Sequence, residues 1–233
     1  MPNALLLLPK GLSIDGGRGR AAISAEVDLD RGDASGTAKV VAQGVHARVG
    51  PEAIDGELRL DLRVNEGEGA SVLSGSTLAF DGTVGTPPVA WWARAALRDA
   101  LLDVRSGLRF RAQVIADAKD ASPLAAIIAN NTDIPRWLLN AISTNGFAAT
   151  GDLLVSPSTF QARSVRARTA GIDLSFELAE LGAEREWALL LDVGIVCAGI
   201  DVSGEQTDVL LFGAKPWFAR KTASLRAVER RYE

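Results

Sequence analysis

The residue types that most often carry enzyme chemistry are scarce in this chain of 233 residues. It has one histidine, His46, and one cysteine, Cys197. A Ser-His-Asp triad would have to use His46, and the sequence contains no GxSxG nucleophile elbow. One His and one Cys also fall short of the ligand set of a typical zinc site, so we predict no metal. We interpret His46 as an ordinary strand residue and Cys197, in the apolar stretch GIVCAGI, as a small buried side chain.

Carboxylates are numerous enough to supply an acid/base pair of the kind that glycosidases use. Most of them stand beside turn residues or alternate with apolar residues, where solubility alone accounts for them. The candidates are Asp28, Asp30, Asp152, Asp173, Asp192, Asp201 and Asp208. The stretch DGGRGRA, which begins at Asp15, lacks the GxGxxG spacing and the P-loop lysine, so it predicts a glycine-rich turn. We therefore predict that the protein is not an enzyme and binds no cofactor.

The charge balance argues against nucleic acid as a partner, since the formal net charge is -4. No run approaches the roughly 20 apolar residues that cross a bilayer, and the opening MPNALLLLPKG lacks the basic region of a signal peptide. The basic exception is the closing stretch KPWFARKTASLRAVERRYE, where Trp217 and Phe218 adjoin Arg220 and Lys221. Aromatic residues beside cations are typical of contact with an anionic membrane surface. A solvated terminal segment, or a strand continuing into further sequence, is the alternative.

Alternation of apolar and polar residues recurs along most of the chain and is the main structural signal. Turn dipeptides separate the alternating runs at intervals of about ten residues, which predicts about twelve to fifteen antiparallel strands. We expect a mainly β fold, built as a large curled antiparallel sheet in the form of a groove, an open barrel or a sandwich. The segment VAWWARAALRDALLDV is interpreted as two strands that turn near Arg98 and Asp99. The clearest apolar strand positions are Leu58, Leu60, Leu62, Phe110, Val114, Leu174 and Phe176.

Residues 122–145 break the alternation and predict two short helices. Ser122 and Pro123 suit the N-cap and first position of one helix. The second helix has an apolar stripe that includes Ile134, Trp137 and Leu138. Because the stripes are narrow, we expect each helix to lie across an open end or face of the sheet, as an end cap or as a movable lid.

The repeated strands, the pair DAKDASPLAAII and IPRWLLNAI, and the closing GIDVSGEQTDVLLFGAKPWF together resemble the AsmA-like and TamB-like bacterial envelope proteins. The resemblance implies a curled sheet whose apolar concave face shields acyl chains while lipids move between membranes. It also implies a place in the cell envelope or periplasm, with a membrane surface or envelope proteins as further partners. Members of this family normally have a membrane anchor and are longer, so the chain would correspond to a C-terminal-type segment of such a protein.

The sequence therefore predicts a single mainly β domain over residues 1–233 that binds or transfers lipid or another hydrophobic ligand. The seven apolar strand positions named above are the predicted lining of the groove, and no residue-specific chemistry is needed for it. Two alternatives stay open. One is an all-β structural or protein-interaction module whose apolar faces pack on each other, and the other is an enzyme.

Overall fold

The structure, a computed structural model, describes residues 12–28, 33–49, 52–65, 70–103, 108–123, 145–157, 159–181, 184–194, 196–204 and 206–229. Its thirteen strands agree with the expected number. They are β1 (Leu12–Asp28), β2 (Asp33–Val49), β3 (Glu52–Val64), β4 (Ser71–Val72), β5 (Thr77–Val84), β6 (Val89–Asp103), β7 (Arg109–Asp120), β8 (Asn145–Ser156), β9 (Thr159–Thr169), β10 (Ile172–Leu181), β11 (Glu184–Val193), β12 (Val196–Ser203) and β13 (Gln206–Leu210). One helix, α3 (Ala214–Glu229), is present in the described part of the chain.

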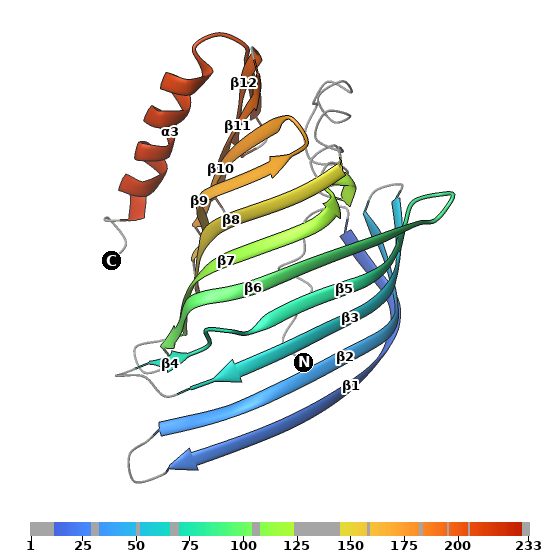
Figure 1. Cartoon of the computed structure of the whole chain (residues 1–233). Helices are drawn as coiled ribbons and strands as arrows, with labels where there is room; N and C mark the ends of the chain where they lie inside the picture. The colour runs from blue at the N-terminus through green and yellow to red at the C-terminus, as the bar shows by residue number, and fades with distance from the viewer. Residues whose placement is uncertain are drawn as a thin grey trace.

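The strands form a single antiparallel sheet in which nearly every strand pairs with the next one along the chain (Figure 1). The exception is the short β4, which pairs with β6, so that β5 lies between β3 and β6. The sheet curls strongly but does not close into a barrel. The predicted fold class, a large curled antiparallel sheet, is therefore confirmed.

The alternation seen in the sequence sorts the side chains of each strand onto two faces. In β3, Leu58, Leu60 and Leu62 fall on one face while Arg59 and Arg63 are exposed on the other. Cross-strand partners share a face in an antiparallel sheet, so the pairing register carries this division from strand to strand. The register shifts between β1 and β2, β2 and β3, β6 and β7, β8 and β9, and β9 and β10, where bulges increase the local bend.

The prediction of two strands within residues 89–103 is wrong, because β6 runs unbroken through Arg98 and Asp99. The expected turn is a β-bulge, with a register shift between Arg98 and Leu101 and a φ of 46° at Asp99. Aspartate tolerates this left-handed conformation better than most residues, so one residue is absorbed without reversing the chain.

The alternative of a strand in the basic closing stretch is also wrong, because this stretch forms α3 as far as Glu229. This helix lies on the outer, convex side of the sheet and contacts β10, β11 and β12 (Figure 1). Leu225 is buried with Ala179 and Ala188, and Trp217 and Phe218 pack against the same cluster. The helix is thus stabilised by apolar contacts with distant strands of the sheet. These contacts cannot be predicted from the local sequence of the helix.

The predicted helices at residues 122–145 lie largely outside the described residues. Ser122 and Pro123, at the predicted start of the first helix, have helical conformation, and the Asp120 carboxylate accepts a hydrogen bond from the Ser122 backbone N–H at 3.0 Å. Asn145, at the end of the predicted region, begins β8. The predicted cap or lid residues Ile134, Trp137 and Leu138 are not among the described residues.

Candidate functional site: the concave face of the sheet

An unbroken row of apolar side-chain positions crosses the sheet from its first strand to its twelfth. Each member is the direct register partner of the next, so all of them share one face. The row continues by the same pairing through the second half of the sheet. Its members are Ala21, Val40, Leu60, Leu78, Ala95, Ala116, Ala149, Ala167, Leu174, Leu191 and Ala198.

All seven predicted lining residues lie on the face that carries this row. In β3, Leu58 and Leu62 flank Leu60 in the row, with one residue between each pair. Val114 and Phe110 share the phase of Ala116 in β7, and Phe176 shares the phase of Leu174 in β10. Alternation alone therefore assigned these positions to one common surface. Their contact with a ligand stays a prediction.

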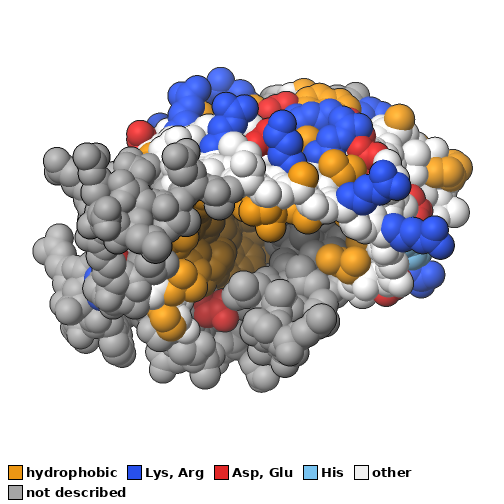
Figure 2. Space-filling view, turned by 90° about the horizontal axis from the view of Figure 1, so that it is seen from below, with side chains coloured by type: hydrophobic (Ala, Val, Ile, Leu, Met, Phe, Trp, Pro, Cys, Tyr) orange, Lys and Arg blue, Asp and Glu red, His pale blue; other side chains and the backbone are white. Residues whose placement is uncertain are grey.

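This face is concave and lines a hollow. Figure 2, a view from below, shows hydrophobic side chains lining the hollow and many Lys and Arg side chains on the outer surface. The sheet curls around this hollow (Figure 1). A sheet with one apolar and one solvated face is common, but its apolar face usually packs on another layer of protein.

Burial varies along the concave face. In β7, Ala112 belongs to a small buried cluster with Leu73 and Ala100, and Phe110 packs against it. Over β9 to β12 the residues form a packed cluster in which Leu174 is 5% exposed and Leu191 and Ile200 are 0% exposed. Leu174 is therefore part of a protein core and the least accessible of the predicted lining residues. Over β3 and β5 the side chains are more open, with Leu60 half-buried and Leu78 41% exposed. The part of the face best suited to an external ligand is therefore the part formed by the earlier strands.

The convex face is polar, and ion pairs connect neighbouring strands on it. Lys39 Nζ lies 4.0 Å from Asp61 Oδ2, and Arg94 Nη2 lies 2.5 Å from Asp81 Oδ1. These side chains occupy the phase opposite to the apolar row, as their register partners show. Most are well exposed, so they contribute solubility and little stability.

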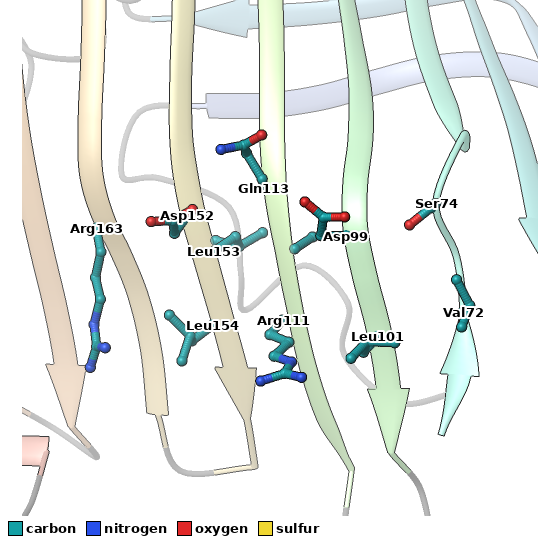
Figure 3. A pocket seen from close by; sticks show the side chains of 11 residues that line it. Val72, Ser74, Asp99, Leu101, Arg111, Gln113, Asp152, Leu153, Leu154 and Arg163 are labelled. Carbon is teal, nitrogen blue, oxygen red and sulfur yellow. The ribbon is translucent and has the colours of Figure 1, made fainter. Parts of the chain in front are cut away.

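A depression of about 560 Å³ on the convex face was not foreseen from the sequence (Figure 3). Gln113, Asp152 and Arg163 come together there from three neighbouring strands, with Arg111 two residues from Gln113 on the same face of β7. Asp99, at the bulge in β6, lies on its other side. Because the lining mixes both signs of charge, it does not select an anionic or a cationic ligand. The depression lies beside a β-bulge, and the alternation of apolar and polar residues does not show where a bulge occurs.

The single histidine, His46, makes a hydrogen bond on the convex face. His46 Nδ1 is hydrogen-bonded to the Asp55 carboxylate, which is its cross-strand partner. The two side chains are 38% and 55% exposed. This is the setting of an ordinary surface pair. Within the described ranges there is no cluster of three or more His, Cys, Asp or Glu residues that could hold a metal ion.

Cys197 lies near the contact between β12 and α3. Burial, aided by the nearby charge of Asp192, raises the pKa of the thiol against the opposing effect of Lys215. Lys215 Nζ in turn lies 2.6 Å from Asp192 Oδ2. A thiol with a raised pKa is a poor nucleophile at neutral pH. Cys197 is half-buried, so the interpretation of a small buried side chain overstates its burial.

The residues predicted to touch a membrane all belong to α3, and most of them face the sheet. Trp217 and Phe218 are half-buried, and Lys221 Nζ lies 3.0 Å from Glu186 Oε2. Burial alone would lower the pKa of Lys221, but its hydrogen bonds with Glu186 and Asp201 and their charges raise it. Arg220 is exposed. Contact of these four residues with a membrane stays a prediction, and no helix of the described chain has the length and apolar character to cross one.

Known proteins offer no guide to this surface, because no protein-family model, no curated protein and no solved structure matches the chain.

Proposed function

We propose that the protein binds or transfers a lipid or another hydrophobic ligand, without catalysis, on the concave face of its sheet. The observation that carries the proposal is the unbroken apolar row from Ala21 to Ala198 along an inward-facing, hollowed surface. The resemblance to AsmA-like and TamB-like envelope proteins supports the same function. It would place the protein in the cell envelope, where it exchanges lipid with a membrane surface.

The dimensions of the concave face suit an acyl chain. Neighbouring strands lie about 4.8 Å apart, so the part of the row from β1 to β8, which precedes the packed cluster and crosses seven strands, measures roughly 29 Å along the curve of the sheet. One leaflet of a bilayer contributes about half of the ~30 Å hydrocarbon core, so an acyl chain of about 15 Å fits within the row. The face therefore offers room for more than one chain.

The energetics also suit a carrier. Burial of about fourteen methylenes out of water contributes roughly 11 kcal/mol at ~0.8 kcal/mol each, before the cost of immobilising the ligand. Exchange between a bilayer and an apolar protein surface changes little of this free energy, because both environments exclude water. A carrier needs this near balance, since it must release its cargo as well as hold it.

The alternative function, a structural or protein-interaction module with a packed core, is favoured by one observation. The cluster over β9 to β12, with Leu189, Leu191 and Ile200 almost fully buried, is packed as a protein interior. If the rest of the concave face is packed in the same way, no ligand enters it.

Ala95 and Ala96 provide a matched test of the two functions. They are adjacent in β6 and both are half-buried, but Ala95 belongs to the concave row whereas Ala96 lies on the convex face. We expect Ala95→Trp to reduce the transfer of a fluorescent phospholipid between vesicles, because the indole occupies the space of an acyl chain. Ala96→Trp should leave transfer unchanged.

The unmodified protein is first analysed by native mass spectrometry and by organic extraction after mild purification. Co-purified phospholipid, together with sensitivity to Ala95→Trp alone, would support the proposal. Protein that carries no lipid and does not accelerate transfer would contradict it and favour the packed module.

A further inference from the structure

The first strand of the sheet leaves a long edge available for pairing. β1 contains 17 residues and, within the described ranges, is hydrogen-bonded on one side only, to β2. A long edge strand presents a row of backbone N–H and C=O groups that can pair with another strand. Ile23 stands on this edge with 76% of its surface exposed, which is unusual for so large an apolar side chain. The edge therefore has the character of an interface.

In the amino-acid sequence of β1, charged residues stand at equal distances on the two sides of Ile23 and have opposite signs. Arg18 and Arg20 precede Ile23 by five and three residues, and Glu26 and Asp28 follow it by three and five. All four positions share one phase of the strand, whereas Ile23 belongs to the other phase. Opposite charges at equal distances from a centre are what a strand needs to pair antiparallel with a copy of itself.

We propose that β1 pairs antiparallel with β1 of a second copy of this chain, about a two-fold axis at Ile23. In this register position 20 of one copy lies opposite position 26 of the other, and position 18 lies opposite position 28. The two-fold axis doubles each pair, so the edge joins a cation to an anion at four places. The two Ile23 residues lie opposite each other at the centre. Such an interface uses the same surface twice and closes on itself, which gives a dimer.

Other registers fit the sequence less well. Moving the axis to Ala22 keeps only one kind of opposite-charge pair, position 18 with 26. Moving it to Ser24 keeps position 20 with 28 within β1, and its second opposite-charge pair, position 18 with 30, needs a residue beyond the end of the strand at Asp28. A register that pairs the two phases with each other would place apolar residues on the charged face. The opposite edge of the described sheet, β13, has five residues and offers a much shorter ladder.

The dimer would join two concave faces into one. Ala21 of each copy lies opposite position 25 of the other, and both positions belong to the same phase as Ile23. The apolar row thus continues across the two-fold axis, while the charged positions remain on the convex side. This inference does not depend on the proposed function, because it rests on the edge strand alone.

Charge-reversed variants of the whole chain provide the test. One variant carries Arg18→Glu and Arg20→Glu, and the other carries Glu26→Arg and Asp28→Arg. Each places like charges opposite each other in its own dimer, so we expect self-association to weaken at least about tenfold. A mixture of the two restores opposite charges at every pair and should form a mixed dimer. Analytical ultracentrifugation and native mass spectrometry measure both outcomes, and circular dichroism checks that each variant is folded.

A disulfide between copies tests the register itself. In a Cys197→Ser background, Ile23→Cys should form an intermolecular disulfide under mild oxidation, because the two cysteines face each other across the axis. Ala21→Cys, two residues away, should not, since its copies lie several residues apart in the ladder. The proposal is overturned if the unmodified chain is monomeric at high concentration. It is also overturned if the mixed variants fail to associate, or if Ala21→Cys links as readily as Ile23→Cys.

Discussion

α3 approaches the sheet closely at Gly199, so replacement of this glycine by alanine should loosen the helix. A Cβ atom placed on Gly199 lies 2.7 Å from Cε3 and Cζ3 of Trp217 and 3.4 Å from the Cβ of Ala214. Carbon atoms in contact prefer a separation of about 3.5 to 4.0 Å. Trp217 must therefore retreat by about 1 Å. The β-strand backbone at Gly199 accepts alanine, so the cost is steric.

The expected cost follows from how Trp217 is held. Its ring packs against Phe218, with ring centroids 6.2 Å apart, and both residues lie against the cluster of Ala188 and Leu225. Overpacking of such a site typically costs about 1–3 kcal/mol. We therefore expect Gly199→Ala to lower the free energy of unfolding by about 1–3 kcal/mol. Hydrogen exchange should become faster in α3, while β1 to β8 should keep their protection.

Urea unfolding and amide hydrogen exchange measure these two effects. Gly19→Ala is the matched control, because a Cβ there would meet only the carbonyl oxygen of Val41, at 3.9 Å. Trp217→Leu added to Gly199→Ala should recover part of the loss by removing the clash. If Gly199→Ala matches the unmodified protein in both stability and exchange, the close packing of Trp217 on the sheet is wrong.

Three further predictions concern the polar contacts around α3. Glu177 is 3% exposed, and its carboxylate accepts a hydrogen bond from Arg226. Arg226→Met should therefore lower the free energy of unfolding in urea by about 1–3 kcal/mol. Arg220→Met, on the exposed side of the helix, should lower it by less than about 0.5 kcal/mol. Cys197 should react with a thiol reagent at pH 8 more slowly than in urea-unfolded protein, because its folded pKa is raised; equal rates would contradict the burial that we describe. The raised pKa of Lys221 means that its contribution to stability is complete below the unfolded value of about 10.4 and is lost as the pH rises above it. Lys221→Met should therefore reduce the loss of stability above pH ~10, and an unchanged pH profile would count against the ion pairs.

The sequence predicts the two faces of the sheet well because alternation is a local property. Leu58, Leu60 and Leu62 fall on the face of Phe110 and Val114 without any knowledge of which strands are neighbours. Whether that face is filled is a different matter. It depends on the curl of the sheet and on what lies across it, and the alternation of residues within one strand predicts neither.

The errors have equally local causes. In α3 the stripe that faces the sheet contains Trp217, Lys221 and Leu225 at intervals of four residues, so a cation interrupts the apolar pattern that would have indicated a helix. Lys221 is tolerated there because it forms ion pairs with Glu186 and Asp201. In β6 the polar pair Arg98 and Asp99 suggested a turn, whereas the register shift shows that a bulge accommodates the pair. Both outcomes depend on tertiary partners.

The pairing of nearly every strand with its successor has a consequence for how this sheet is assembled. Each ladder joins segments that are close in sequence, so the entropy lost in closing any one loop is small and the sheet can form hairpin by hairpin. In the described sheet, no later strand has to insert between two earlier ones. A hairpin can therefore be added or removed without rerouting the rest of the chain. The breadth of the sheet is in this sense an adjustable quantity, set by the number of hairpins.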